Sequence, residues 1–118
     1  MKKTPENLIQ QQIVLYLNAN YFKTHIVFSV PNEIPYPLPT KIMALILSKL
    51  QSYGMLKGAN DLTIYGPNQK YISVEVKTEK GTQSPAQVIF QKRVESIGGI
   101  YLIVRSLEDF IEKFNVYL

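Results

Sequence analysis

The order in which helix-type and strand-type apolar patterns follow one another limits the fold of this chain more than any other feature. Apolar residues recur at helical spacing in the segments that begin near residues 4, 40, 84 and 106. Segments rich in β-branched and aromatic residues lie at 25–30, 61–65, 71–77 and 100–104. The resulting order is α-β-α-β-β-α-β-α, which predicts an α/β fold with a mixed central β-sheet flanked by helices.

Local signals support the helix positions. Thr4-Pro5 and Ser84-Pro85 each combine a capping hydroxyl with a proline at the first helical position. We expect Thr40 to cap the second helix and Gly54 to end it. The apolar stripe of the second helix consists of Ile42, Leu45, Ile46, Leu50 and Tyr53. The third helix is expected to bury Ala86, Ile89, Phe90, Val94 and Ile97.

Composition limits the class of protein. The chain has 118 residues, of which 46% are hydrophobic, so we expect one domain over residues 1–118 with one core. No apolar run approaches the roughly 18 residues of a membrane span, and no signal region follows the first lysines. We therefore expect a soluble, cytoplasmic protein. A formal charge of +4 is compatible with a polyanionic partner and is weak evidence alone.

Residue usage also restricts the kind of metal site. The chain has no cysteine and one histidine, His25, which excludes thiolate and multi-histidine sites within one chain. A metal site would have to use carboxylates, carbonyls and water. Those ligands suit Mg²⁺ or Mn²⁺.

The charged residues of the predicted hairpin at 61–77 share one face. Strand side chains alternate between two faces, so Glu75 and Lys77 project together while Val76 faces the core. Asp61 begins the preceding strand, and hairpin pairing brings it toward the same end. We therefore expect Asp61, Glu75 and Lys77 to form one cluster.

Two carboxylates beside a lysine suit phosphodiester hydrolysis. The carboxylates of Asp61 and Glu75 can hold a divalent cation, with the Val76 carbonyl as a further ligand. The Lys77 ammonium can orient water and stabilise charge on the phosphate. For an isolated Glu-x-Lys pattern, the alternative is a solvated strand face.

The cluster lies within a longer motif. Its residues are Gly54, Gly58, Asn60-Asp61-Leu62, Val74-Glu75-Val76-Lys77, Gly81, Ser84 and Gln87. This motif resembles the VRR-NUC domain of the PD-(D/E)XK nuclease superfamily, which includes restriction endonucleases and Holliday junction resolvases. The resemblance covers nearly the whole chain, including the segment 31–33, and implies a restriction-endonuclease-like core. One departure is Asn60, where the family usually has proline.

The resemblance implies a role for each matching residue. Asp61 and Glu75 would bind the metal, and Lys77 would be the catalytic lysine. Gln87 would support the site or meet the DNA; the alternative is an exposed polar residue. Glu6 lies on the same stripe of the first helix as the residues expected to be buried. It also matches a glutamate that the family has near the metal. The alternative role for Glu6 is a favourable interaction with the helix dipole.

Other candidates are less constrained. Glu33 would lie near the active site by resemblance, or in an exposed loop. His25 is expected to be structural. Lys57 and Lys80 flank the catalytic motif and are candidate DNA-phosphate contacts, with solubilising charge as the alternative.

The sequence thus favours a Mg²⁺- or Mn²⁺-dependent DNA endonuclease. Small stand-alone members of the family, many from phages, look like dimeric enzymes that act on branched DNA such as Holliday junctions. We therefore expect a homodimer in a bacterial cell or phage-infected host. The alternatives are a non-catalytic nucleic-acid-binding module of the same fold and a less selective nuclease or nicking enzyme.

Overall fold

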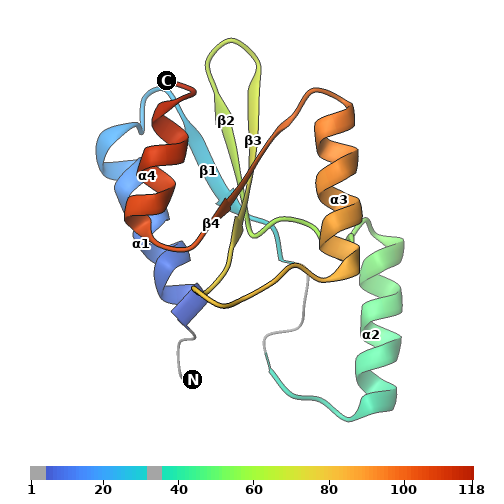
Figure 1. Cartoon of the computed structure of the whole chain (residues 1–118). Helices are drawn as coiled ribbons and strands as arrows, with labels where there is room; N and C mark the ends of the chain where they lie inside the picture. The colour runs from blue at the N-terminus through green and yellow to red at the C-terminus, as the bar shows by residue number, and fades with distance from the viewer. Residues whose placement is uncertain (1–4, 32–35) are drawn as a thin grey trace.

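A computed structural model describes residues 5–31 and 36–118 and confirms the predicted order of elements (Figure 1). It therefore says nothing about the predicted cap at Thr4 or about Glu33. The helices are α1 (Pro5–Asn20), α2 (Thr40–Ser52), α3 (Pro85–Ser96) and α4 (Leu107–Asn115). The strands are β1 (Ile26–Ser29), β2 (Leu62–Gly66), β3 (Lys70–Val76) and β4 (Ile100–Val104).

The sheet is mixed, as predicted, and its strands lie in the order β1-β2-β3-β4. β2 pairs antiparallel with β1 and with β3, and the β2–β3 pair is the predicted hairpin. β3 pairs parallel with β4, and α3 makes the crossover between them. In Figure 1, α1 and α4 lie side by side against one face of the sheet and α3 lies against the other. β3 is therefore paired on both edges.

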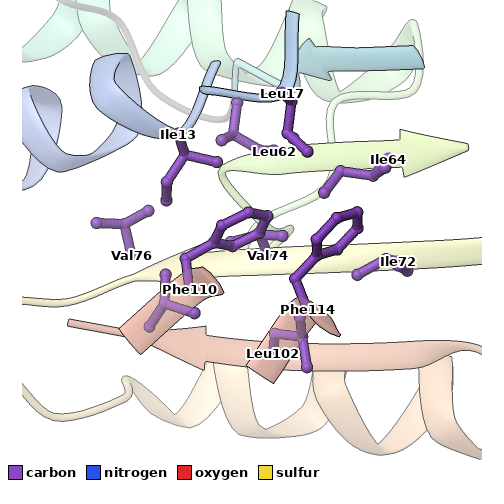
Figure 2. Close-up of a cluster of buried hydrophobic side chains, with 11 residues drawn as sticks. Ile13, Leu17, Leu62, Ile64, Ile72, Val74, Val76, Leu102, Phe110 and Phe114 are labelled. Atoms are coloured by element: carbon purple, nitrogen blue, oxygen red, sulfur yellow. The ribbon is translucent and has the colours of Figure 1, made fainter. Parts of the chain in front are cut away.

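The core lies between the sheet and the pair α1–α4 (Figure 2). Alternate residues of the strands point into it, and both phenylalanines of α4 stack there with ring centroids 5.1 Å apart. Its buried members are Ile13, Leu17, Leu62, Ile64, Ile72, Val74, Val76, Leu102, Val104, Phe110 and Phe114.

The opposite face of the sheet is only partly covered. α3 lies against β4, where the Phe90 ring packs 6.1 Å from the Tyr101 ring. The expectation that α3 buries its apolar set is wrong. The helix has no buried residue, since Ala86, Phe90 and Val94 are only half-buried. Ile89 and Ile97 are 61% and 87% exposed. The helix rests on the sheet along one narrow side, so these two side chains point to solvent.

Helix α2 is an exposed helix with no buried residue. Its apolar stripe, predicted from the spacing, is present but faces solvent; Leu45, for example, is 72% exposed. Figure 1 shows α2 beyond α3, on the far side from the core. Among the described residues, no helix is long and apolar enough to cross a membrane.

The helix starts agree with the predicted caps except at Thr40. Ser84 forms a reciprocal capping box with Gln87, and the Ser106 hydroxyl accepts from the Asp109 N–H at 3.0 Å. Thr40 is instead the first helical residue, and Pro39 occupies the cap position without a side-chain hydrogen bond. The extended φ/ψ of Pro39 (−53°, 142°) moves the helix start to Thr40.

The contact between Gly58 and α3 gives a stability prediction. Gly58 has φ +82°, and a Cβ there would lie 2.5 Å from the Ala86 carbonyl. Gly54 also has a positive φ, +109°, but a Cβ there would meet nothing within 4 Å. Gly58→Ala should therefore destabilise the fold by about 3 kcal/mol or more, against about 1–2 kcal/mol for the control Gly54→Ala. Urea unfolding of both variants measures this; equal losses would show that α3 does not pack against Gly58.

Candidate active site

The candidate site lies at the end of the β2–β3 hairpin farthest from its turn. Asp61 directly precedes β2, and its N–H donates to the Val74 carbonyl at 2.9 Å. Glu75 is the penultimate residue of β3, and Lys77 follows the strand. Val74 and Val76 point into the core, so Glu75 lies on the opposite face, as predicted.

Asp61 lies in a partly buried position where its charge is disfavoured. Burial raises the pKa of Asp61 from 3.8 to about 6, and the negative charges of Glu6 and Glu75 add to this. Two interactions oppose the rise: the Val76 N–H donates to Asp61 Oδ2 at 2.7 Å, and the Lys77 ammonium attracts the carboxylate. The structure therefore brings the predicted cluster within electrostatic reach of Asp61.

The carboxylate of Glu75 is buried, and its two oxygens differ in their hydrogen bonds. Only 1% of the residue is exposed. Its Oε1 accepts from the Tyr101 hydroxyl at 2.6 Å and from Gln83 Nε2 at 3.1 Å. Its Oε2 is buried and has no hydrogen-bond partner among residues 5–31 and 36–118. Such an oxygen is costly in a folded protein and is a position at which a bound cation fits.

Glu6 lies close enough for its charge to raise the Asp61 pKa, and its side chain is half-buried. It shares the α1 stripe with the buried Ile13. Within residues 5–31 and 36–118, however, no three His, Asp or Glu side chains stand close enough together to hold a metal ion. The metal roles of Glu6, Asp61, Glu75 and the Val76 carbonyl therefore stay predictions.

Gln87 takes part in the capping box at the start of α3. Its amide oxygen accepts from the Ser84 N–H at 2.8 Å, which closes the capping box at the start of α3. The glutamine that contacts Glu75 is Gln83, which also donates to Gln91 Oε1 at 2.9 Å. No described contact tests the support of the site or the DNA contact expected of Gln87, so both stay predictions.

Three residues of the site were not foreseen: Tyr101, Gln83 and Gln91. The alternation of β4 was a usable signal, since it places Tyr101 on the face opposite the buried Leu102. In the β3–β4 pair, Tyr101 lies opposite Ser73, which is two residues before Glu75 on the same face of β3. This register depends on the long α3 crossover. Local pattern could not supply that register.

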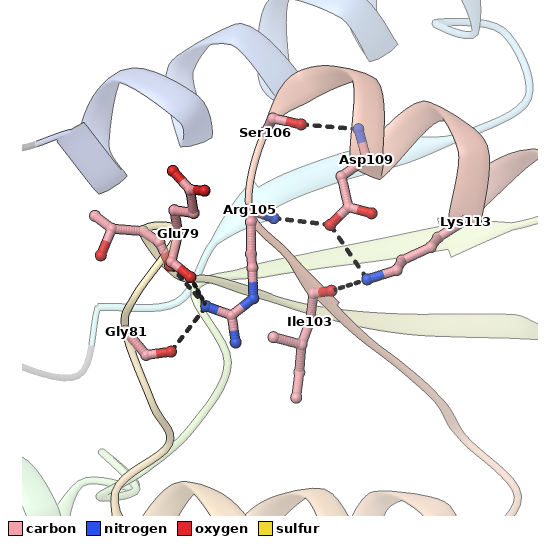
Figure 3. Close-up of polar contacts among 8 residues, drawn as sticks. Glu79, Gly81, Ile103, Arg105, Ser106, Asp109 and Lys113 are labelled. Carbon is pink, nitrogen blue, oxygen red and sulfur yellow. Dashed lines mark hydrogen bonds and ion pairs between the residues drawn. The ribbon is translucent and has the colours of Figure 1, made fainter.

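Arg105 fixes the loop that follows Lys77 (Figure 3). Its Nη1 donates to the carbonyls of Thr78, Glu79 and Gly81 at 2.6, 3.2 and 2.8 Å. This loop carries Lys80, whose side chain is exposed. Arg105 therefore fixes the backbone on both sides of Lys80, and the DNA contact expected of Lys80 stays a prediction.

The remaining predicted residues lie around this centre. Lys57 is exposed and lines, with Arg93, a shallow pocket of about 190 Å³ against α3. The structural role predicted for His25 is confirmed: its Nδ1 lies 2.8 Å from the Thr24 hydroxyl and its ring packs edge-on against Phe114. Asn60 is buried, and its amide donates to the Leu62 carbonyl and to the Thr63 hydroxyl. These bonds stabilise the turn into β2.

Comparisons with known proteins support the fold. No protein-family model and no curated protein matches the sequence. A solved structure titled "VRR_NUC domain protein" is similar with a TM-score of 0.73 and 16% identity, over 100% of this chain and 91% of its own. Another, titled "VRR_NUC domain", has a TM-score of 0.67 and 20% identity, over 98% of this chain and 100% of its own.

The chain therefore has an α/β fold of the restriction-endonuclease-like type, and specifically the fold of a VRR-NUC domain. The resemblance found in the sequence motif is confirmed at the level of the fold. The similarity extends over the complete sheet and its helices, so the Asp61–Glu75 cluster lies within the shared fold.

The raised pKa of Asp61 predicts a pH-dependent stability. The folded protein holds the Asp61 proton up to about pH 6, whereas the unfolded chain loses it near pH 3.8, so stability falls as pH rises through this window. Asp61→Asn removes the charge and keeps an oxygen for the Val76 N–H. At pH 7 without metal it should stabilise the protein by about 2 kcal/mol, and the gain should vanish below about pH 4.

Urea unfolding of both proteins at pH 4 and pH 7 measures this difference. Glu79→Gln, at an exposed position in the neighbouring loop, is the matched control and should show little change. A gain from Asp61→Asn that is equal at both pH values would contradict the raised pKa.

Proposed function

We propose that this chain is a divalent-metal-dependent DNA endonuclease that hydrolyses phosphodiester bonds. The observation that carries the proposal is the buried, unpartnered Oε2 of Glu75, close to the Asp61 carboxylate. The charges of Asp61 and Glu75 repel each other, and a cation would relieve both that repulsion and the unpaired oxygen. The donors are oxygens only, which suits Mg²⁺ or Mn²⁺.

Each residue then has a defined task. Asp61, Glu75 and the Val76 carbonyl hold the metal, and Glu6 joins directly or through water. When bound, the metal polarises a phosphoryl oxygen and lowers the pKa of its water. Lys77 orients that water and stabilises negative charge on the phosphate. Lys57 and Lys80 contact DNA phosphates on either side of the cluster.

The proposed substrate is branched DNA such as a Holliday junction. A formal charge of +4 favours a polyanion. The described elements form one sheet with its helices, and this compact unit suits recognition of DNA shape better than base sequence. The alternative is a less selective nuclease, and a panel of DNA substrates distinguishes it from a junction-selective enzyme.

We also propose that the enzyme is a homodimer that uses the exposed apolar side of α2. The helix buries no residue, and Leu45 and Tyr53 are 72% and 73% exposed. Large contiguous apolar surface of this kind marks protein interfaces. Two copies would supply one active site for each of two DNA strands.

Cleavage assays with Glu75→Gln test the proposal. Glutamine has nearly the same shape but removes the charge, so cleavage in Mg²⁺ or Mn²⁺ should fall by at least about 100-fold. EDTA should abolish cleavage by the unaltered protein. Labelled junction, flap, duplex and single-stranded DNA form the panel, and we expect the junction to be cut fastest.

The matched control is Glu79→Gln, which alters a nearby exposed glutamate and should leave cleavage unchanged. Full activity of a folded Glu75→Gln protein would exclude this site. DNA binding without metal-dependent cleavage of any substrate would favour the non-catalytic binding module.

A further inference from the structure

The two hydrogen bonds to Glu75 converge on one oxygen. The Tyr101 hydroxyl and the Gln83 amide both donate to Oε1, at 2.6 and 3.1 Å, while Oε2 receives none. A carboxylate has several acceptor positions on each oxygen, so sharing the donors between both oxygens would be the ordinary way to satisfy it. The observed arrangement leaves one oxygen unpaired inside the protein.

Both donors are themselves fixed by other contacts. Gln83 Nε2 also donates to Gln91 Oε1 at 2.9 Å, which sets the orientation of the Gln83 amide. Tyr101 is only 9% exposed, and its ring packs against Phe90 of α3. The two donors therefore come from two separate segments, β4 and the loop before α3, and α3 supplies the groups that hold them, so their geometry depends on the complete fold.

We propose that Tyr101 and Gln83 are positioning residues that reserve Glu75 Oε1 for the protein and leave Oε2 for the metal. This inference rests on the proposed function. Partners that orient a metal ligand typically change metal affinity or activity 10- to 100-fold when they are removed. Without the two donors, the Glu75 side chain loses the contacts that fix which of its oxygens is left without a hydrogen bond.

A purely structural role makes a different prediction. If the two bonds only satisfy a buried carboxylate, their removal lowers the stability of the metal-free protein and leaves metal affinity unchanged. If they position Glu75, metal affinity falls, and the fall depends on the presence of the Glu75 carboxylate. Metal affinity therefore separates the two roles.

Mn²⁺ binding to the purified protein, followed by isothermal titration and by the electron paramagnetic resonance of free Mn²⁺, is the test. Tyr101→Phe removes only the hydroxyl, and Gln83→Met removes the amide at similar size. Each should weaken Mn²⁺ binding about 10-fold. The control is Tyr71→Phe, which removes a hydroxyl from a 58% exposed tyrosine on β3 and should change nothing.

A double-variant cycle with Glu75→Gln completes the test. In the Glu75→Gln background, Tyr101→Phe should have no further effect on Mn²⁺ binding, because the group that it positions is gone. Gln83 lies in a half-buried loop, so Gln83→Met carries the test if Tyr101→Phe does not fold.

The outcomes are distinguishable. Unchanged Mn²⁺ affinity in Glu75→Gln would overturn the proposed metal site and, with it, this inference. Loss of binding in Glu75→Gln, with unchanged affinity in Tyr101→Phe and Gln83→Met, would overturn the positioning role and leave the proposed function standing.

Discussion

Strand β3 presents apolar side chains to the core on one face and a buried carboxylate on the other. It pairs with β2 along one edge and with β4 along the other, and it carries Glu75 of the candidate site. Val74 and Val76 pack into the core on one face. Glu75, which lies between them in the sequence, is buried on the opposite face. The packing of the valines fixes the backbone from which Glu75 projects, so the position of the carboxylate depends on the hydrophobic core.

Burial of two carboxylates is unfavourable for a metal-free protein. Burial and the charges of Glu6 and Glu75 raise the pKa of Asp61 to about 6, and Glu75 Oε2 has no hydrogen-bond donor. Backbone and side-chain donors offset only part of this cost. Unfavourable groups of this kind cluster at functional sites, where a ligand compensates for them.

Local pattern was sufficient to predict some parts of the structure. Two-residue alternation correctly placed Glu75 on the face opposite Val74 and Val76, and hairpin pairing correctly brought Asp61 to the same end of the strand. That Lys77 shares the face of Glu75 stays a prediction. Tyr101 and Gln83 could not be predicted, because their contacts depend on a parallel register set by the α3 crossover. The exposure of α2 could not be predicted from the sequence either. An apolar stripe has the same residue spacing whether it packs against this chain or against another molecule.

A crystal structure of the protein in Mn²⁺, with anomalous diffraction used to locate the ion, tests the central claim most directly. We expect one anomalous peak about 2.0–2.6 Å from Glu75 Oε2 and from the Asp61 carboxylate, with Oε1 still bonded to Tyr101. A peak that avoids Glu75, or an Oε2 that stays unpaired at saturating Mn²⁺, would contradict the assignment of this carboxylate as a metal ligand.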